Sequence, residues 1–554
     1  MTRIARSALL ALGVALVAIP ATAQDAQHAA HGNSAAAGVP IIQGLGSYHR
    51  AISSTNADAQ QYFDQGIRLT YAFNHLEAIR AFEEAARRDP SCAICLWGVA
   101  FGYGSNINLP MDSASAVAAF AALQRAQQLA ANASESERAF IDALAKRYDG
   151  TLNGQPARDS AYAKAMKELA ARYPDDTDAL TLHADAVMNL SPWYYWEGTE
   201  QRPQTAEMLG SLERALRIDS THPGACHLWI HAVEAAYPER AVPCAERLAG
   251  LMPSAGHLVH MPGHIYIRVG RYADAIAANE HAVHADETYI QDRSPTAGVY
   301  TLGYYPHNYD FLAFAAMMTG RSQQSIEASD KQSSVIPLEI AGAPGMGFAQ
   351  GHLTRHYQMR VRFGRWDEIL AKPAPPENLV HANAVRHYAR GRAFAAKGDI
   401  ASADAELAQL KAAIASPNLE GVRMEFNESR KILGIAERVL AANIAFAKGQ
   451  KEQAVSLLQQ AAEIEDGLTY GEPPEWSVPV RQELGAVLLA AGKPVAAERA
   501  YREDLKRFPK NGWSLKGLEL ALRAQKKTSE ADAVAREFAA AWNGADVTLT
   551  SSKF

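Results

Sequence analysis

Two short stretches of the sequence place histidine side chains at helical spacing. His257, His260 and His264 stand at positions i, i+3 and i+7, and His227 and His231 stand at i and i+4. Residues at these spacings project from one side of an α-helix. Imidazoles one helical turn apart can bind a single ion, and neutral imidazole is a ligand for zinc, copper and iron. Each stretch therefore predicts a helix face made of metal ligands.

A third stretch adds another histidine, and carboxylates accompany the imidazoles. Glu234 continues the face of His231, and Asp310 follows His307 by three residues. Mixed imidazole and carboxylate ligands are typical of catalytic sites with an open position, or of iron and copper centres. We predict a divalent transition metal (Zn, Cu or Fe), with Glu234 and Asp310 as acid–base candidates or as orienting partners. The predicted ligands are His227, His231, His257, His260, His264 and His307.

The histidines are concentrated in one part of the chain. Half of all 18 lie within residues 222–307, less than one-sixth of the sequence. Crowded imidazoles repel one another when protonated, and a metal or a bound anion relieves that repulsion. None of the four cysteines falls on these faces, which argues against a thiolate zinc site of the structural kind. The alternative is a groove of hydrogen-bonding histidines that binds a peptide without a metal.

Aromatic residues near the histidines are candidates for the walls of a pocket. Trp193, Tyr195 and Trp196 lie in one cluster and Tyr304 and Tyr305 in another. Such a cluster can wall a ligand site, although it more often fills an irregular contact between repeats. A cation near the histidines, Arg268, is the remaining candidate for contact with a substrate.

The segment that carries three of the histidines has the spacing of a 34-residue helix–turn–helix repeat. Gly263, Tyr266, Ala275 and Ala282 supply its small and aromatic positions. The same pattern recurs at 59–90 and at 478–511. In these positions the chain resembles the tetratricopeptide (TPR) repeat family. The resemblance implies an all-α, right-handed solenoid that binds protein or peptide, and it specifies no reaction.

The resemblance also implies where the histidines point. When Gly263 is taken as position eight of the repeat, the three histidines before and after it occupy positions two, five and nine. In TPR proteins these positions of the first helix line the concave groove. His281 and His284 fall on the second helix of the same repeat, so we expect them on the convex, solvated side.

The start of the chain predicts export. Arg3 and Arg6 precede an apolar core of 12 residues, and Ala21-Thr22-Ala23 has the small-x-small pattern of a cleavage site. We therefore predict a signal peptide over 1–23, a disordered arm over 24–55, and a periplasmic or secreted protein. No insertion in the membrane is expected after cleavage. The repeats divide into an N-terminal part (56–221), a central part with the histidine-rich groove (222–345) and a C-terminal part with its cap (346–554).

Four cysteines in an exported chain are more often paired than reactive. Cys92 and Cys95 form a C-x-x-C, but Leu96 follows where a haem-attachment motif needs histidine. Cys226 and Cys244 are placed to link the two helices of one repeat. The sequence leaves both pairings open, because geometry decides them.

The net charge and the absence of several known motifs reduce the number of function classes that the sequence supports. The net charge of −6 gives no support for a nucleic-acid partner. No serine-nucleophile elbow, phosphate-binding glycine loop or dinucleotide fingerprint has a suitable context. Two hypotheses stay open. The first is a metal site that binds or transforms a small molecule or peptide, as a hydrolase or oxidoreductase if it is an enzyme. The second is a metal-free scaffold for protein–protein interactions in the periplasm.

Overall fold

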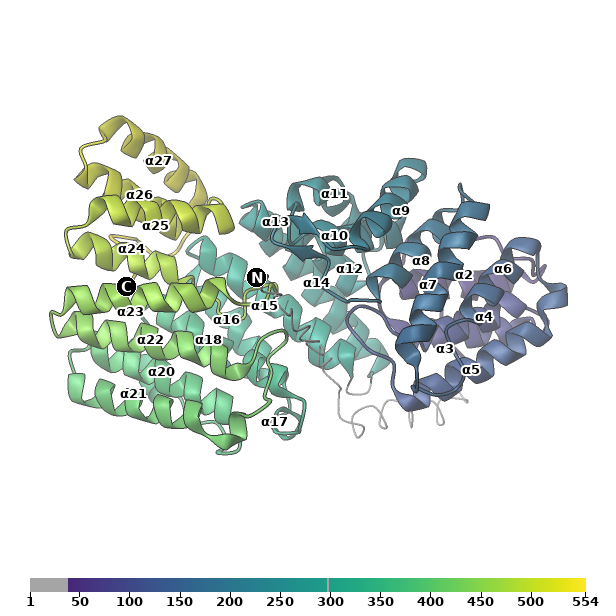
Figure 1. The fold of residues 1–554 in the computed structure, drawn as a ribbon, viewed down its shortest axis with the longest axis horizontal. Coiled ribbons are helices and arrows are strands. Elements are labelled where there is room, and N and C mark those ends of the chain that lie inside the picture. The colour runs from purple at the N-terminus through teal and green to yellow at the C-terminus, as the bar shows by residue number, and fades with distance from the viewer. Residues whose placement is uncertain (1–37, 296–297) are drawn as a thin grey trace, which may run out of the picture.

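The computed structural model describes residues 38–295 and 298–554. In these residues the chain forms antiparallel helix pairs that stack one after another, as Figure 1 shows from purple through teal to yellow. The only paired strands in this part of the chain are the two-residue β1 (Trp196–Glu197) and β2 (Glu200–Gln201). The protein is an all-α, TPR-like solenoid, as the sequence predicts.

The helices before residue 335 build the N-terminal and central repeats. They are α2 (Ala57–Tyr71), α3 (His75–Arg88), α4 (Ala93–Gly102), α5 (Ser113–Gln128), α6 (Glu135–Leu144), α7 (Gln155–Arg172), α8 (Thr177–Met188), α9 (Thr205–Ile218), α10 (Pro223–Val233), α11 (Val242–Leu251), α12 (Gly256–His260), α13 (Pro262–Arg268), α14 (Tyr272–Arg293), α15 (Tyr305–Met318) and α16 (Ser322–Ser334). A π-helical turn, η4 (Tyr300–Tyr304), precedes α15, and short 3-10 turns lie at η2 (Ala130–Asn132) and η3 (Pro238–Ala241).

The remaining helices build the C-terminal repeats. They are α17 (Leu338–Ala341), α18 (Gly347–Arg362), α19 (Trp366–Ala371), α20 (Val380–Ala396), α21 (Ile400–Ala415), α22 (Ser429–Ala447), α23 (Lys451–Asp466), α24 (Val480–Ala490), α25 (Pro494–Arg507), α26 (Gly512–Ala524) and α27 (Thr528–Ala541), with a 3-10 turn at η5 (Pro417–Leu419). Met359 of α18 and Phe363, which follows this helix, join the core of the preceding repeats, while Tyr357 and Val361 of α18 join the core of the following ones. This helix therefore links the two halves of the solenoid.

An aromatic ring on the second helix of a pair holds the first helices together. Phe82 of α3 is fully buried between Gly66 of α2 and Gly98 of α4. A Cβ atom at either glycine would lie 2.5 Å from the Phe82 ring. Tyr501 of α25 has the same relation to glycines of α24 and α26, where an added Cβ would approach to 2.3 and 2.1 Å. The glycine and aromatic positions of the repeat pattern are thus explained by close helix packing.

The helix that carries the central histidines is interrupted. α12 ends at His260 and α13 begins at Pro262, because proline has no N–H for the hydrogen bond of a continuing helix. The chain nevertheless continues in nearly helical conformation, with φ −51° and ψ −36° at Met261. The predicted single helix is therefore two short ones in line.

The arm predicted over 24–55 is only in part outside the described residues. Residues 38–55 are irregular but held against the repeats. The Tyr48 hydroxyl donates to Asp178 Oδ1 at 2.6 Å, and Arg50 donates to Asp178 Oδ2 at 2.6 Å. The prediction of disorder is thus wrong for residues 38–55, because buried hydrogen bonds and ion pairs offset the conformational entropy that the segment loses on ordering. The predicted signal peptide lies outside the described residues.

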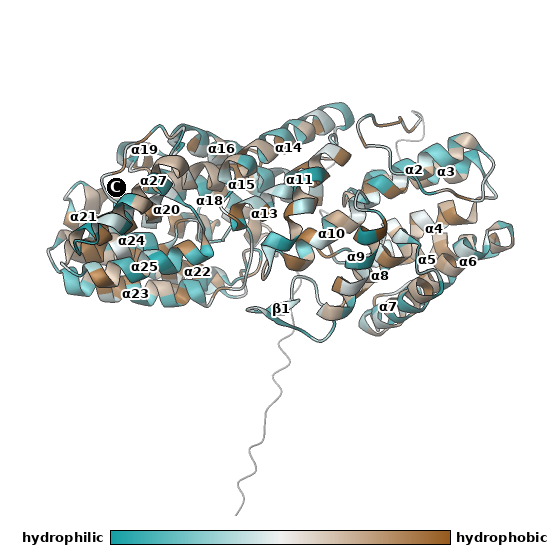
Figure 2. Ribbon diagram, turned by 90° about the horizontal axis from the view of Figure 1, so that it is seen from above, coloured by the Kyte–Doolittle hydropathy of each residue, from teal (hydrophilic) through white to brown (hydrophobic). Residues whose placement is uncertain are grey.

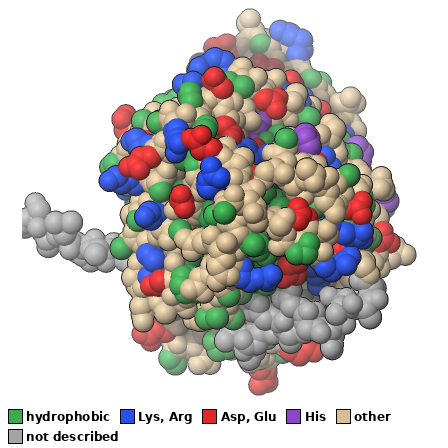
Figure 3. Space-filling model, turned by 90° about the vertical axis from the view of Figure 1, so that its right-hand side faces the viewer, with side chains coloured by type: hydrophobic (Ala, Val, Ile, Leu, Met, Phe, Trp, Pro, Cys, Tyr) green, Lys and Arg blue, Asp and Glu red, His purple; other side chains and the backbone are tan. Residues whose placement is uncertain are grey.

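The surface and the cysteines complete the fold. Polar and apolar residues alternate along the helices (Figure 2), and acidic and basic side chains are interspersed on the face in Figure 3. Within the described ranges, no helix is long and apolar enough to cross a membrane. Both pairings that the sequence leaves open are disulfides, Cys92–Cys95 and Cys226–Cys244. The second joins α10, which carries two of the histidines, to α11.

Candidate metal centre

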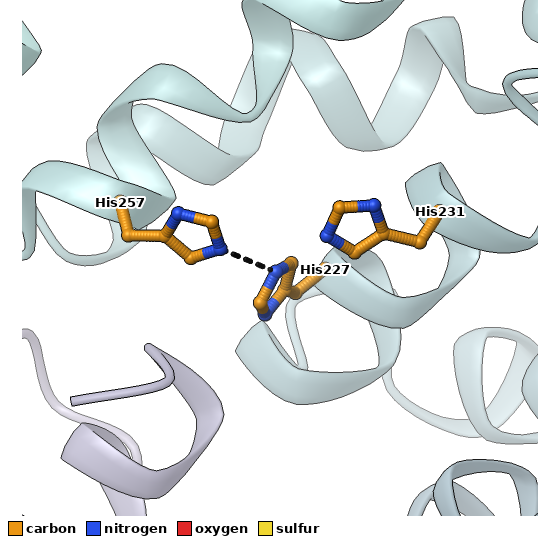
Figure 4. A group of neighbouring side chains, drawn as sticks. All are labelled: His227, His231 and His257. Carbon is orange, nitrogen blue, oxygen red and sulfur yellow. Dashed lines mark hydrogen bonds between the residues drawn. The ribbon is translucent and has the colours of Figure 1, made fainter. Parts of the chain in front are cut away.

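The six predicted ligands come together inside the protein as two groups of three. His227, His231 and His257 form one group, which we call the first triad. In Figure 4 these three side chains, two from α10 and one from α12, point toward a common space. Nε2 of His227 and Nε2 of His257 are hydrogen-bonded at 3.2 Å. His260, His264 and His307 form the second triad. In each triad one nitrogen per residue lies within 4.8 Å of the others.

The two triads are neighbours. The ring centroids of His231 and His264 are 5.6 Å apart, and those of His257 and His260 are 6.1 Å apart. The sequence predicts six ligands on the first helices of neighbouring repeats, directed into the concave groove. The structure buries five of the six rings to 3% exposure or less and leaves only His307 half-buried. The loop of the C-terminal repeats that carries Glu472 contributes to this burial, because it reaches His264.

Hydrogen bonds fix the orientation of several imidazoles. His227 donates from Nδ1 to the carbonyl oxygen of Tyr71 at 2.7 Å. Asn279 donates its amide N–H to the carbonyl of Ala275, so its Oδ1 faces His260 and accepts from Nδ1 at 2.7 Å. In both residues the second nitrogen, Nε2, therefore carries the lone pair. Nε2 of His227 faces Nε2 of His257, and Nε2 of His260 has no hydrogen-bond partner among the described residues. Outer partners of this kind hold a histidine in the tautomer that can bind a metal.

Glu234 contacts one histidine of each triad. Its Oε1 accepts from Nδ1 of His231 at 3.5 Å, and its Oε2 lies 2.9 Å from Nδ1 of His264. The latter is an ion-pair contact whose angle lies outside hydrogen-bond geometry. Among the described atoms, Nε2 of both histidines has no hydrogen-bond partner although both rings are buried. An unpaired buried nitrogen costs free energy unless something fills the space beside it.

A second carboxylate reaches His264 from the C-terminal repeats. Glu472 lies in the loop between α23 and α24, and its Oε2 is 3.3 Å from Nδ1 of His264. Its other oxygen accepts from the Tyr470 hydroxyl and lies 3.4 Å from Nε of Arg268. Glu234, His264 and Glu472 themselves form a third group of possible ligands. The loop therefore closes the site and adds a second carboxyl group beside His264.

Burial keeps most of the imidazoles neutral. Desolvation and the neighbouring imidazoles lower the pKa of His227, His257, His260 and His307 well below the ordinary value. The pKa of His231 is lowered in the same way. Burial also acts to lower the pKa of His264, but Glu234 and Glu472 outweigh it and raise the pKa to about 10. Five of the six rings are therefore in the protonation state that metal binding requires.

Two aromatic residues with strained backbone cover the first triad. Phe73 has φ 54° and Trp193 has φ 66°, values that bulky residues rarely adopt. The Phe73 ring lies 4.4 Å from His227, and the Trp193 ring lies 4.8 Å from His231. Strain of this kind clusters at functional sites, and here it presses two rings onto two candidate ligands.

The other predicted pocket residues are not all at the site. Tyr304 is, since its ring lies 4.3 Å from His257. Trp196 donates to the carbonyl of Ala232 and packs on a tyrosine of the neighbouring turn. Tyr195 is buried in the core. Tyr305 is half-buried and pairs with Glu287 at 3.3 Å.

The two charged candidates lie at the edge of the histidines. Asp310 accepts from Arg355 at 2.5 Å, while its Oδ1 has no partner among the described residues. Arg268 donates to the carbonyl of Ala235 and faces Glu472. Both are therefore engaged by other side chains. His281 and His284 are exposed, as expected for the second helix of the repeat.

Sequence reasoning misses Phe73, Asn279, Glu472 and Glu425. Glu472 stands in a proline-rich loop far along the chain, and nothing local marks it. Glu425 lies near the second triad, where its side chain keeps contact with solvent although protein atoms are packed around its carboxyl group. Desolvation and the carboxylates of Glu475 and Asp310 raise its pKa to about 8.

No protein-family model and no curated protein matches the sequence. Solved structures match over most of the chain. The human IFIT1 dimer with m7Gppp-AAAA is 10% identical over 82% of this chain and 90% of that chain, with a TM-score of 0.32. The APC/C hetero-tetramer Cut9–Hcn1 is 13% identical over 88% and 74%, with a TM-score of 0.29. Yeast Tom70 is 13% identical over 87% and 91%, with a TM-score of 0.26. TM-scores of this size transfer no function, and the fold assignment depends on the helix pairs described above.

Proposed function

We propose that this is an exported TPR-like protein whose centre holds a transition metal at its histidines and binds or transforms a small molecule or peptide there. The supporting observation is the direction of the imidazoles. His227 and His260 are anchored through Nδ1, so that Nε2 faces the neighbouring histidines. A histidine cluster that serves only packing has no need of this arrangement in two triads.

The donor atoms narrow the class of metal. Neutral imidazole suits zinc, copper and iron, whereas magnesium and calcium prefer oxygen ligands. The first triad contains three histidines and no carboxylate, and Glu234 and Glu472 lie beside the second. A bound ion of this class activates water or dioxygen. Among the protein groups, Glu234 is better placed than Asp310 to hold a proton near the centre, because Arg355 already pairs with Asp310.

A metal-free scaffold for protein–protein interactions is the second candidate. It is favoured by the TPR-like fold, which provides a large surface for a protein or other ligand. It does not account for the anchored imidazoles. The two candidates therefore differ in whether the histidines are needed for a bound ion.

Metal analysis of the purified mature chain tests the proposal. The wild type, loaded with Zn, Cu or Fe and freed of loose ions, is compared with a His260→Ala/His264→Ala variant. A His281→Ala/His284→Ala variant is the matched control, since it removes two exposed histidines from the same repeat. We expect stoichiometric metal in the wild type and the control and a large loss in the first variant. A wild type that retains none of the three metals would leave the scaffold as the better proposal.

Export is tested separately. Expression with residues 1–23 should place a shortened chain in the periplasm or the medium, with its first residue near Gln24. A chain of full length in the cytoplasm would contradict export and leave the metal centre untouched.

A further inference from the structure

We infer that the centre is dinuclear, with one ion in each triad, and that the first ion is accessible only to ligands of a few atoms. This inference rests on the proposed metal centre and adds the number of ions and the size of the ligand. One ion cannot be shared by all six histidines, because they separate into two groups of mutually close nitrogens.

The first triad has the geometry of ligands on one ion. Zinc lies about 2.0–2.1 Å from imidazole nitrogen, so two ligands at a tetrahedral angle are about 3.3 Å apart. Nε2 of His227 and Nε2 of His257 are 3.2 Å apart. A nitrogen of His231 completes the group, and Nε2 of this residue has no hydrogen-bond partner among the described atoms. Figure 4 shows the three rings directed at the space between them.

The second triad repeats this arrangement on the next helices. Nε2 of His260 is buried without a hydrogen-bond partner in the described part of the chain, and so is Nε2 of His264. The ring of His307 lies 4.9 Å from that of His260 and 5.6 Å from that of His264. The structure therefore provides two sets of three imidazoles, and each set has at least one buried Nε2 without a hydrogen-bond partner among the described residues.

Glu234 couples the two positions. It contacts the Nδ1 side of His231 in the first triad and of His264 in the second. In each of these histidines Nε2 is buried without a hydrogen-bond partner among the described residues. A change in charge at one position is transmitted to the other through a single buried carboxylate.

The two positions differ in what covers them. Each histidine of the first triad has its own aromatic ring, with Phe73 on His227, Trp193 on His231 and Tyr304 on His257, at 4.4, 4.8 and 4.3 Å. In the second triad one ring, Phe311, contacts all three histidines, at 4.5–5.0 Å. The side of the second triad that Phe311 does not cover includes the half-buried His307. The first triad is thus enclosed and the second is open on one side.

Two small cavities adjoin the first triad. His227 lines one and His257 lines the other, and each leaves about 20 Å³ open to the centre of a water molecule. That is room for about one or two waters. Each cavity borders one histidine of the triad and has room for a water, a hydroxide or a small ion such as azide, and not for an organic ring.

Titration of the metal-free full chain with Co²⁺ counts the positions. We expect two equivalents for the wild type and one each for His257→Ala and His307→Ala, with His257→Gln and His307→Gln as variants that keep more of the packing. One equivalent in the wild type would overturn the dinuclear centre and leave the proposed function standing. No binding of any metal would instead contradict the proposed function. Glu472→Gln should still bind two, and a drop to one would overturn the assignment of the second ion to the triad.

Two probes test access in the single-ion variants. In His307→Ala, where only the first triad is complete, azide should shift the Co²⁺ absorption bands and free imidazole should not. In His257→Ala, where only the second triad is complete, both should shift them. Equal responses to imidazole in the two variants would overturn the difference in access.

Discussion

Glu234 lies between His231 and His264, with one carboxylate oxygen 3.5 Å from Nδ1 of the former and the other 2.9 Å from Nδ1 of the latter. A single side chain, directly after the last residue of α10, thereby contacts one histidine in each triad. Because it is 1% exposed, its charge acts in a medium that screens little. The geometry of both triads depends on this residue.

The first prediction concerns this carboxylate. Glu234→Gln keeps the shape but gives an amide, which can accept from one Nδ1–H while its N–H₂ opposes the other. We expect metal affinity to fall by about 10–100-fold, the range for losing a partner of a metal-bound histidine. Competition with a chromophoric chelator measures it. Glu239→Gln, an exposed neighbour, should have no effect, and an equal loss there would show that the effect is not local.

The second prediction separates the triads. Asn279 is fully buried and accepts from Nδ1 of His260 at 2.7 Å. Asn279→Leu removes that acceptor, so we expect the second triad to lose tenfold or more in affinity and the first to be unchanged. Asn279→Asp restores an acceptor and should restore most of the affinity. The two affinities are read by titration of His257→Ala and His307→Ala backgrounds, and an equal loss in both would contradict the assignment.

The third prediction concerns the backbone strain at Phe73. At its φ of 54°, glycine is tolerated and alanine is strained. Both Phe73→Ala and Phe73→Gly lose the buried ring, but we expect the glycine variant to be the more stable by about 1 kcal/mol. Phe63, fully buried inside α2, is the control, where alanine should be better than glycine by about 1 kcal/mol. Thermal unfolding of the four variants shows which of alanine and glycine is the more stable at each position. The same ranking at Phe73 and Phe63 would refute the backbone strain at Phe73.

The fourth prediction concerns the disulfide that fixes α10. Cys226 and Cys244 are 18 residues apart, whereas Cys92 and Cys95 are three apart. The stabilisation by a disulfide increases with the loop it closes and is about 3 kcal/mol near this length. We therefore expect Cys226→Ala/Cys244→Ala to lower the melting temperature more than Cys92→Ala/Cys95→Ala. The same ranking should appear in metal retention, because only the Cys226–Cys244 disulfide holds α10, the helix of His227 and His231. A reversed ranking in both measurements would contradict this role.

The sequence predicts those parts of the fold and site that depend on local spacing. The glycines and aromatics of the repeat report the helix packing directly, as Phe82 and Tyr501 show. Histidines three, four and seven residues apart must share a helix face, and the resemblance to the TPR repeat implies that this face points inward. The interruption at Pro262 follows from its missing N–H.

Other features depend on contacts that spacing cannot report. Glu472 reaches His264 across 208 positions of the chain, and its loop is recognisable only as proline-rich. The division into two triads depends on the offset between neighbouring helices, and the sequence gives their order but not that offset. The left-handed backbone of Phe73 has no sequence signature, because glycine or asparagine would be expected there. Burial of the groove follows from the same long-range loops.

The fifth prediction concerns acid stability in the C-terminal repeats. Glu483 is buried, which by itself raises its pKa, but Arg392 at 3.0 Å and Lys553 at 3.1 Å outweigh this and lower the pKa to about 2. A carboxyl group whose pKa is lower in the folded state stabilises the fold above its ordinary pKa near 4.5, and this contribution is lost as the pH falls toward 2. The shift corresponds to about 3 kcal/mol at pH 7.

We expect the difference in melting temperature between wild type and Glu483→Gln to shrink as the pH falls from 7 to 3. The slope with pH is the decisive quantity, since the substitution also leaves Arg392 unpaired at every pH. Glu463→Gln, exposed on the neighbouring helix pair, should show a constant difference, and a constant difference for Glu483→Gln as well would rule out this ion pair as a source of acid sensitivity.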